Sequence, residues 1–249
     1  MTDRHPELEA LDALLEHTWA ELLSRPVAAN FLTSPASADR RMLALYLIQA
    51  YHYASHTSRN QAAVGVSMRT SNVHYLKYVY EHALEEVGHE LMALHDLRAL
   101  GVAIEDPARD MPAPLPETEV LIAYLYYVAN FGNPVQRLGY SYWAESAYGV
   151  GQSFLDGITA RMNLGREQLT FFHVHADIDA KHANDVEKAL LKACETPADW
   201  KAVRRAAETS LRLNWAMIEA EFAEWEKLEA GEPSDYTLLN QLSQEVSSS

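Results

Sequence analysis

The sequence is poor in residues that mark several common classes of protein. Cys194 is the only cysteine, which excludes a disulfide framework and fits a reducing cytoplasm. Only 20 Lys and Arg oppose 35 Asp and Glu, giving a net charge of −15. This charge argues against nucleic acid or an anionic membrane surface as a partner. The longest nearly apolar run, Val120–Phe131, is too short to span a bilayer, and the charged residues 1–19 lack the apolar core of a signal peptide. We therefore expect a cytoplasmic protein.

Strand patterns are also missing. No segment alternates apolar and polar residues with the period of two that strands require, whereas helical spacing recurs throughout, with proline at several starts and glycine at several ends. With 48% apolar residues, the chain can bury a sizeable core. The sequence predicts an all-α fold, with one domain over residues 1–231 and a polar tail over 232–249. The helices that we expect cover residues 6–25, 38–56, 72–100, 117–131, 134–149, 152–162, 166–194 and 198–230.

One of these helices carries polar side chains where a buried face would normally have Leu or Val. His175, Asp179 and His182 are spaced i, i+4 and i+7, so that they fall within roughly 60° of arc on one face. Unpaired imidazoles and carboxylates are costly to bury, and coordinating a divalent transition metal offsets that cost. A hydrogen-bonded core network is the alternative explanation of this triad.

Two other helices contribute similar groups. Glu86 and His89 are three residues apart on the helix predicted over 72–100, a spacing that is common by chance. Glu145 is the only acid in the aromatic stretch Tyr140–Tyr148, although helices also tolerate a single solvated acid. Three carboxylates and three imidazoles exceed the four ligands of a structural zinc site. They suit two iron or manganese ions bridged by carboxylates in the core of a helical bundle.

An absence of acids bears on this ligand set. Between Glu21 and Glu81 the only acidic residue is Asp39, which stands at a predicted helix start. The core helix that follows therefore offers no carboxylate. It offers His52 and His56 at i, i+4, a possible ligand pair whose spacing ordinary packing explains equally well.

The stretches HALEEVGHELMALHDLRALG and PVQRLGYSYWAES, followed by His-x3-Asp-x2-His, resemble the heme-oxygenase-like non-heme di-iron oxidases and oxygenases. That family includes fatty-acid decarboxylases that form terminal alkenes, amino-acid fragmenting enzymes and N-oxygenases. The resemblance covers roughly residues 8–230 and implies a bundle of seven to eight helices that binds two irons and no heme. Several members have a further glutamate on the preceding core helix, where this chain has His52 and His56. Carried over residue by residue, the implied ligands are Glu86, His89, Glu145, His175, Asp179 and His182.

The expected function is O2-dependent oxidation or oxygenation of a small molecule by C–H abstraction, C–C cleavage or N-oxygenation. An amino acid, an amine or a carboxylic acid is the expected substrate, O2 the co-substrate, and an external electron donor is possible. We also expect a homodimer. Aromatic residues within Tyr124–Phe131 and Tyr140–Tyr148 are candidate pocket walls. Arg137 is either an anchor for a substrate carboxylate or a solvated arginine.

Three alternatives come from other classes of protein. A ferritin-like ferroxidase would share the Glu-x-x-His pattern, but it would need a carboxylate on its first core helix. A heme-degrading enzyme would use one proximal histidine near the amino terminus, for which His17 is the candidate, and would leave the triad unexplained. A thiaminase-like hydrolase of the same fold would need a nucleophilic cysteine, and Cys194 lies near a helix end, about three turns from the triad.

Overall fold

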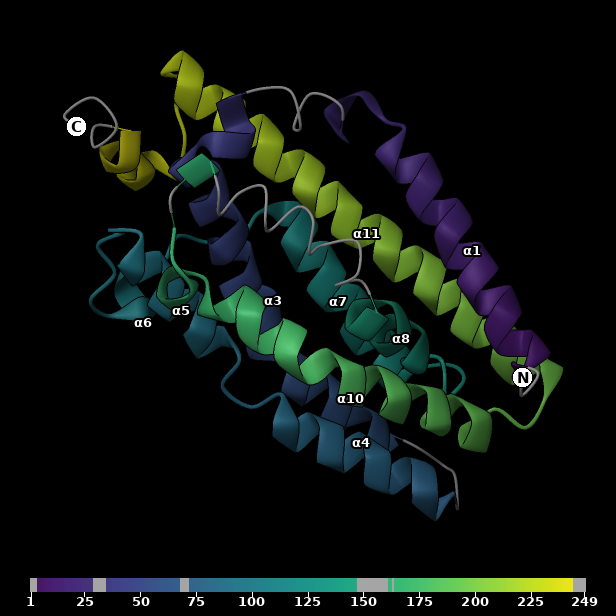
Figure 1. The fold of residues 1–249 in the computed structure, drawn as a ribbon. Coiled ribbons are helices and arrows are strands. Elements are labelled where there is room, and N and C mark those ends of the chain that lie inside the picture. The colour runs from purple at the N-terminus through teal and green to yellow at the C-terminus, as the bar shows by residue number, and fades with distance from the viewer. Residues whose placement is uncertain (1–3, 29–34, 68–71, 147–160, 163, 244–249) are drawn as a thin grey trace.

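In this computed structural model of the chain, the described residues are 4–28, 35–67, 72–146, 161–162 and 164–243, with only the backbone described at 35, 146 and 175–181. Within these ranges the regular structure is entirely helical, so the all-α prediction is confirmed (Figure 1). The helices are α1 (Pro6–Leu23), α3 (Arg40–Ser67), α4 (Val73–Glu85), α5 (Glu90–Ala99), α6 (Pro107–Asp110), α7 (Pro116–Asn130), α8 (Leu138–Ser146), α10 (Thr170–Ala193) and α11 (Pro197–Ala230). Short 3-10 helices span Pro35–Ala38, Arg166–Gln168 and Thr237–Ser243.

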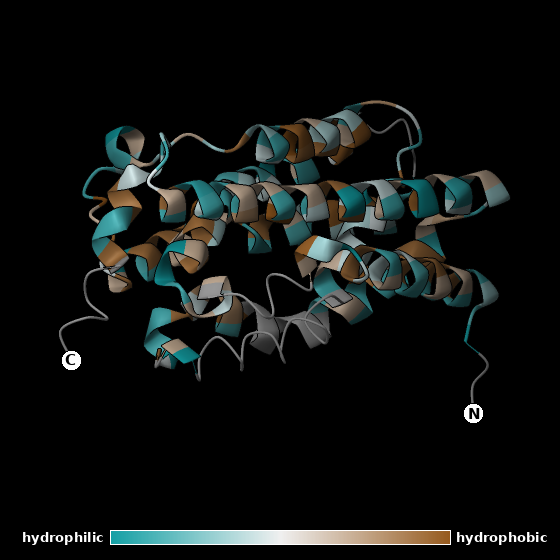
Figure 2. Cartoon of the chain, turned by 90° about the horizontal axis from the view of Figure 1, so that it is seen from above, coloured by the Kyte–Doolittle hydropathy of each residue, from teal (hydrophilic) through white to brown (hydrophobic). Residues whose placement is uncertain are grey.

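The long helices pack in three layers (Figure 1). Helices α1 and α11 lie against each other on one side, α3, α7 and α8 form the middle, and α4, α5 and α10 cover the other side. Figure 2 shows hydrophilic and hydrophobic residues along each long helix, as expected when one face of a helix packs on its neighbours. Among the described residues, no helix combines the length and apolar character of a membrane span.

Local signals determine where α11 begins and ends. The Thr196 side chain accepts a hydrogen bond from the backbone N–H of Asp199, and the Asp199 carboxylate accepts one from the Thr196 N–H. Pro197 occupies the first helical position, where its missing N–H has no cost. At the other end Gly231 adopts φ +68, a left-handed conformation that favours glycine. These are the ends that the sequence predicted.

The helix predicted over residues 72–100 is wrong in one respect, because it is broken in the middle. Helix α4 ends at Glu85 and α5 begins at Glu90, with a turn between them. Gly88 has φ +91 in this turn, a backbone conformation that a right-handed helix cannot contain. The break places Glu86 at the end of one helix and His89 at the start of the next.

Helix α8 approaches α11 very closely. A Cβ added at Gly139 would lie 2.2 Å from the carbonyl oxygen of Val203 and 2.7 Å from the backbone nitrogen of Ala207. Only glycine permits this approach, which holds α8 against α11 one and a half turns before Glu145. The prediction that Pro134 opens the helix is wrong, because residues 134–137 form a turn and α8 starts at Leu138.

The buried residues form two clusters, one around α3, α5 and the C-terminal end of α11, the other around α1, α7, α8 and the rest of α11. The segment after Gly231 joins the first cluster. Tyr236, Leu239 and Leu242 are buried there, and the last 3-10 helix, which begins just after Tyr236, packs against α3. The described part of the predicted polar tail is therefore docked on the core.

Candidate metal centre

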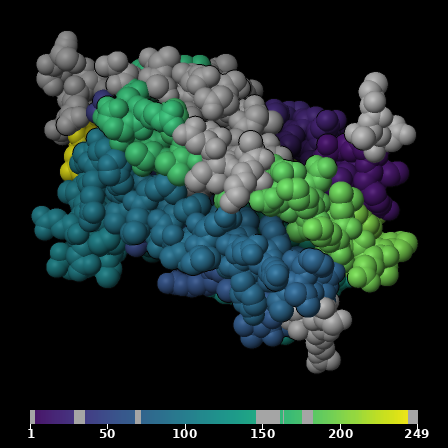
Figure 3. All heavy atoms as spheres, turned by 60° about the horizontal axis from the view of Figure 1, so that its bottom comes forward, coloured from purple at the N-terminus to yellow at the C-terminus, as the bar shows by residue number. Residues whose placement is uncertain are grey.

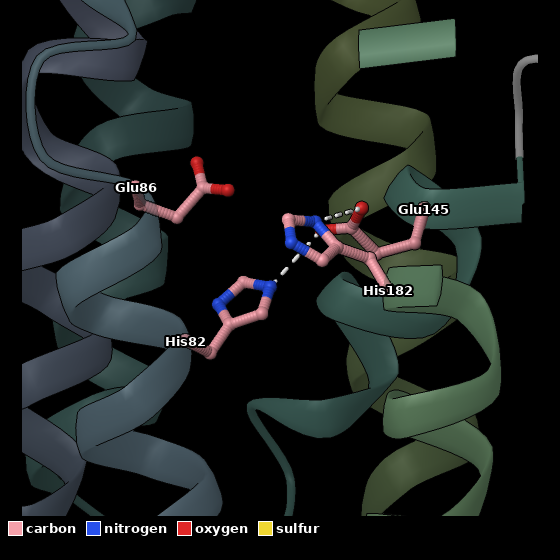
Figure 4. Close-up of side chains that lie close together, drawn as sticks. All are labelled: His82, Glu86, Glu145 and His182. Carbon is pink, nitrogen blue, oxygen red and sulfur yellow. Dashed lines mark hydrogen bonds and ion pairs between the residues drawn. The ribbon is translucent and has the colours of Figure 1, made fainter. Parts of the chain in front are cut away.

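Four side chains from three helices converge at one buried point. One ligand atom from each of His82, Glu86, Glu145 and His182 can be chosen so that all four lie within 4.8 Å of one another. Figure 4 shows His82 and Glu86 at α4, facing Glu145 from α8 and His182 from α10. Three of the four residues are buried and Glu145 is nearly so. Two imidazoles and two carboxylates so close together could hold a divalent metal ion.

Helical spacing explains how α4 presents two of these groups. Tyr75 and Val79 are buried on the inner face of α4, and His82 and Glu86 continue that face at i+7 and i+11 from Tyr75. Glu86 is the C-cap of α4, and its backbone N–H bonds to the carbonyl oxygen of His82. The two side chains therefore follow each other by one turn and point toward the same neighbours.

Glu145 is held between two imidazoles. Its Oε1 lies 3.1 Å from Nε2 of His82 and its Oε2 lies 3.2 Å from Nδ1 of His182 (Figure 4). The other nitrogen of His182, Nε2, lies 3.2 Å from Oε2 of the half-exposed Glu85. The two imidazole rings are 5.3 Å apart between centroids. Each of the three polar contacts joins a carboxylate to an imidazole, so these contacts are electrostatically complementary.

The pKa shifts follow from these contacts. Burial opposes the charged form of Glu145, but hydrogen bonds from His182 and His82 prevail and lower its pKa to about 2. The pKa of Glu86 is also lowered: burial works in the opposite direction, and the hydrogen bond from His89 outweighs it. The hydrogen bond to Glu145 raises the pKa of His182. The site therefore contains ionised carboxylates that require positive charge nearby.

The structure brings together three of the six predicted ligands, Glu86, Glu145 and His182. His89 lies next to them, with its Nδ1 3.3 Å from Oε2 of Glu86, and is 9% exposed, but it is outside the group of four. The backbone at His175 and Asp179 is helical within α10, as the spacing argument required. Their side chains lie outside the described residues.

The fourth member of the group, His82, was missed in the sequence. The predicted ligand set takes Glu86 and His89 from this part of the chain and does not include the histidine one turn before Glu86. The signal was available, because His82 precedes Glu86 by four residues and follows Val79 by three. A histidine next to a candidate ligand on the same helical face is worth including in a ligand set.

The donor set fits a divalent transition ion. Among the described residues, Nδ1 of His82 is a buried nitrogen without a hydrogen-bond partner, which is costly unless the ring has another use. Two imidazoles and two carboxylates suit iron or manganese. Protons on the imidazoles and a metal ion are alternative ways of balancing Glu86 and Glu145, because a ligating imidazole must be neutral.

The other histidines of interest are engaged elsewhere. Nε2 of His52 lies 2.7 Å from the carbonyl oxygen of Pro112, and Nδ1 of His56 lies 3.0 Å from the hydroxyl of Tyr126. Burial lowers the pKa of both. His17, the candidate for a proximal heme ligand, is exposed on α1. None of the three belongs to the group of four.

Cys194 does not have the surroundings of a nucleophile. It is buried at the C-cap of α10, and burial raises the pKa of its thiol to about 12. A thiol with so high a pKa carries almost no thiolate at neutral pH. The hydrolase that would need it loses support.

Arg137 is buried, only 1% exposed, and not solvated as one alternative expected. Its Nε donates to Oδ1 of Asn60 and its NH1 donates to Oγ of Ser141. The guanidinium lies 4.4 Å above the centroid of the Tyr140 ring. Burial lowers its pKa, while the charge of Glu86 is among the influences that raise it. Arg137 thus supplies positive charge within electrostatic reach of the metal candidate.

A groove of about 380 Å³ leads from the surface to two of the four residues. Figure 3 shows α4 and the C-terminal part of α10 at the surface on one face of the molecule. His82 and His182 lie at the inner wall of the groove between these helices, and Tyr78 lies beside them. Its rim is charged and carries Lys77, Glu81, Glu85, Asp185, Lys188 and Lys192. The candidate metal centre is therefore accessible from solvent.

Comparisons with known proteins agree with this fold. A protein of unknown function with a heme oxygenase-like fold from Shewanella denitrificans OS217 is 38% identical, matches 92% of this chain and 97% of that chain, and superposes with a TM-score of 0.85. A TenA homologue from P. horikoshii OT3 (15% identity, 87% and 98% covered, TM-score 0.67) and one from Pseudomonas syringae (14%, 88% and 93%, 0.68) share the fold alone. A search of the curated proteins found no match. A sequence model named for iron-containing redox enzymes matches residues 44–215, and the chain belongs to that family.

Proposed function

We propose that this protein is an O2-dependent non-heme di-iron oxidase or oxygenase that acts on a small molecule. The observation that carries the proposal is the convergence of His82, Glu86, Glu145 and His182 at one buried point. Membership of an iron-containing redox family supports the choice of metal. The donor set supports it independently, because nitrogen and carboxylate oxygen ligands without thiolate suit redox-active iron.

The proposed ligands are the six that the sequence predicted, with His82 added as a ligand or as a partner of Glu145. Bound iron would supply electrons to O2 and so provide the oxidant. Residues next to the proposed ligands orient them and balance their charge. The Glu85 carboxylate lies 3.2 Å from Nε2 of His182. Contacts of this kind orient metal-binding histidines. Arg137 balances part of the negative charge, and Tyr140 lies under its guanidinium.

The groove between α4 and α10 provides a route from solvent to His82 and His182. Its volume of about 380 Å³ is within the range of small-molecule sites. An amino acid, an amine or a carboxylic acid stays the predicted substrate class. The external electron donor, the homodimer and the cytoplasmic location also stay predictions.

Iron stoichiometry tests the metal part of the proposal. Protein loaded anaerobically with Fe(II) and then desalted should hold close to two irons per chain and no heme. We expect Asp179→Ala to lose iron and O2 reactivity while keeping its helical content, because an apolar core of this size does not depend on one carboxylate. Asp185→Ala is the matched control, since Asp185 is on the same helix and pairs with Lys188 at the surface.

Stopped-flow absorbance after O2 addition tests the activity. O2 consumption should be tied to product formation when candidate amines, amino acids or carboxylic acids are present. Repeated oxidation of many Fe(II) equivalents per site would point to a ferroxidase instead. Stoichiometric heme binding that His17→Ala abolishes would point to the heme-degrading alternative, and equal iron binding by Asp179→Ala and the wild type would refute this ligand set.

A further inference from the structure

A second buried carboxylate lies outside the four-residue group. Glu221 is on the inner face of α11, is 0% exposed, and is one turn from the fully buried Met217. Within the described part of the chain, neither of its carboxylate oxygens has a hydrogen-bond partner. No ion pair with a described residue is formed by Glu221 either, whereas Glu224, one turn further on, pairs with Lys227.

This position is expensive for a carboxylate. Burial alone raises the pKa of Glu221 well above its ordinary value, because a charge without a partner is poorly tolerated in an apolar core. Leu, Met or Gln would pack on the same helical face at a lower cost. A buried polar group without a partner therefore calls for a functional explanation.

Two tyrosines, Tyr46 and Tyr236, are within electrostatic reach of Glu221. Burial is the main cause that raises the pKa of Tyr46 and that of Tyr236, each to about 12, and the charge of Glu221 adds to it. The hydroxyl of Tyr46 is 3.3 Å from that of Tyr53, which is also on α3. The Tyr46 ring stacks on Phe172 of α10, with 5.4 Å between centroids. Tyr46, Tyr53 and Phe172 thus form an aromatic group, and Tyr46 in this group is within electrostatic reach of Glu221.

One more tyrosine, Tyr140, is within electrostatic reach of both Tyr46 and the candidate metal centre. The pKa of Tyr140, on α8, is raised to about 12, mainly by burial. The charges of Glu86, Glu145 and Tyr46 also raise it, so Tyr140 is within electrostatic reach of all three. Tyr53 packs against both buried clusters. Tyr46 is therefore within electrostatic reach of Glu221, and Tyr140 is within electrostatic reach of Tyr46, Glu86 and Glu145.

We propose that Glu221, with Tyr46 and Tyr53, forms a subsite for the protonated amine of a small ligand with an aromatic or apolar body. An ammonium group matches a lone carboxylate, donates hydrogen bonds to it, and is attracted by neighbouring aromatic faces. A metal ion matches less well, because the surrounding tyrosines have high pKa values and supply no anionic ligand. The role of this subsite in turnover rests on the proposed function, but amine binding itself does not.

Isothermal titration calorimetry on the metal-free full chain tests the subsite. The probes are 2-phenylethylamine and 2-phenylethanol, which share a carbon skeleton and differ in charge. We expect the wild type to bind the amine roughly tenfold or more tightly than the alcohol. Glu221→Gln should remove this preference, because the amide keeps the shape and loses the charge. Glu226→Gln, the same change at an exposed position of α11, should retain it.

Two further measurements keep the test decisive. Tyr46→Phe keeps the carboxylate and should weaken amine binding less than Glu221→Gln does, so that the proposal remains testable if the glutamine variant fails to fold. Iron content, measured in parallel, should be the same in Glu221→Gln and the wild type. Equal binding of amine and alcohol by the wild type, or an unchanged preference in Glu221→Gln, overturns the subsite. Loss of iron in Glu221→Gln would also overturn the subsite, and it would leave the di-iron proposal in place. A wild type that binds no iron but prefers the amine would refute only the di-iron proposal.

Discussion

Glu145 and Glu221 are both carboxylates on the inward faces of core helices, and their pKa values shift in opposite directions. Glu145 lies between two imidazoles, and their hydrogen bonds lower its pKa to about 2 although burial opposes this. Glu221 has no partner among the described residues, and burial raises its pKa. The comparison shows that the partner, and not the burial, decides whether an interior carboxylate is charged.

The two regions also differ in the polar groups that they present to a ligand. Around Glu145 the protein has assembled carboxylate and imidazole groups that are hydrogen-bonded to one another. A divalent ion can replace the protons of the imidazoles without a large rearrangement of charge. Around Glu221 the described residues provide one carboxyl group and no hydrogen-bond partner for it, so the complementary charge has to arrive with a ligand. The same substitution in the two regions should therefore have opposite effects on stability.

The largest effect is expected for Glu145→Gln. The variant removes a negative charge from the centre of the group and leaves His82 and His182 without their shared acceptor. We expect Fe(II) affinity to fall roughly 100-fold or more, measured by anaerobic competition with a metal-binding dye. Glu187→Gln, on the surface of α10, is the control for the same chemical change. Unaltered affinity in Glu145→Gln would remove Glu145 from the ligand set.

The pH dependence of the metal-free protein should show the depressed pKa of Glu145. Its folded pKa of about 2 is below the unfolded value, so its contribution is present above about pH 4.5 and is lost as the pH falls toward 2. The shift corresponds to roughly 3 kcal/mol. His182 has a raised pKa, so its contribution is present below about pH 6.5 and is lost as the pH rises through the folded value.

Urea unfolding of metal-free protein across this pH range checks the assignment. Stability should be greatest between these two limits, and Glu145→Gln should flatten the acid side of the curve. An acid side that stays equally steep in Glu145→Gln would mean that other carboxylates cause it.

A smaller effect of opposite sign is expected for Glu221→Gln. Because the pKa of Glu221 is raised in the folded protein, the residue costs more stability as the pH rises above its unfolded value. Replacement by Gln should raise the free energy of unfolding by roughly 1–2 kcal/mol at neutral pH, and the gain should grow between pH 5 and 8. Glu226→Gln should change stability little. Destabilisation by Glu221→Gln across this whole range would show that the carboxylate has a partner.

The sequence allowed much of the fold to be predicted, because its signals are local. The Thr196–Asp199 cap, Pro197 and Gly231 define α11 without reference to the rest of the chain. Helical spacing also indicated the helix that carries His182. The order of the helices follows from periodicity and composition alone.

The features that were missed depend on tertiary contacts or on choices among similar residues. Gly88 stands between strong helix formers, Glu85 and Glu86 before it and Glu90 and Leu91 after it, so this single glycine is the local signal for the break between α4 and α5. His82 was one of several histidines on its helix. Glu221 is one of many glutamates on α11, and only its position on the same face as Met217 distinguishes it. The contact of Gly139 with the backbone of Val203 could not be seen before the helices were packed.

The smallest expected effect tests that unpredicted break. Gly88 has φ +91, and the nearest atom to an added Cβ is 3.9 Å away, so Gly88→Ala introduces backbone strain without a steric clash. The strain should cost roughly 1–2 kcal/mol. Gly231→Ala is a matched control, because Gly231 has φ +68 and nothing lies within 4 Å of its added Cβ. Both variants should lose similar stability in urea unfolding, but only Gly88→Ala should also lose iron affinity, since it alters the turn that orients Glu86 and His89. If Gly88→Ala binds iron as the wild type does, the break between α4 and α5 does not position the metal centre, and the helix end at Glu85 alone is sufficient to place Glu86.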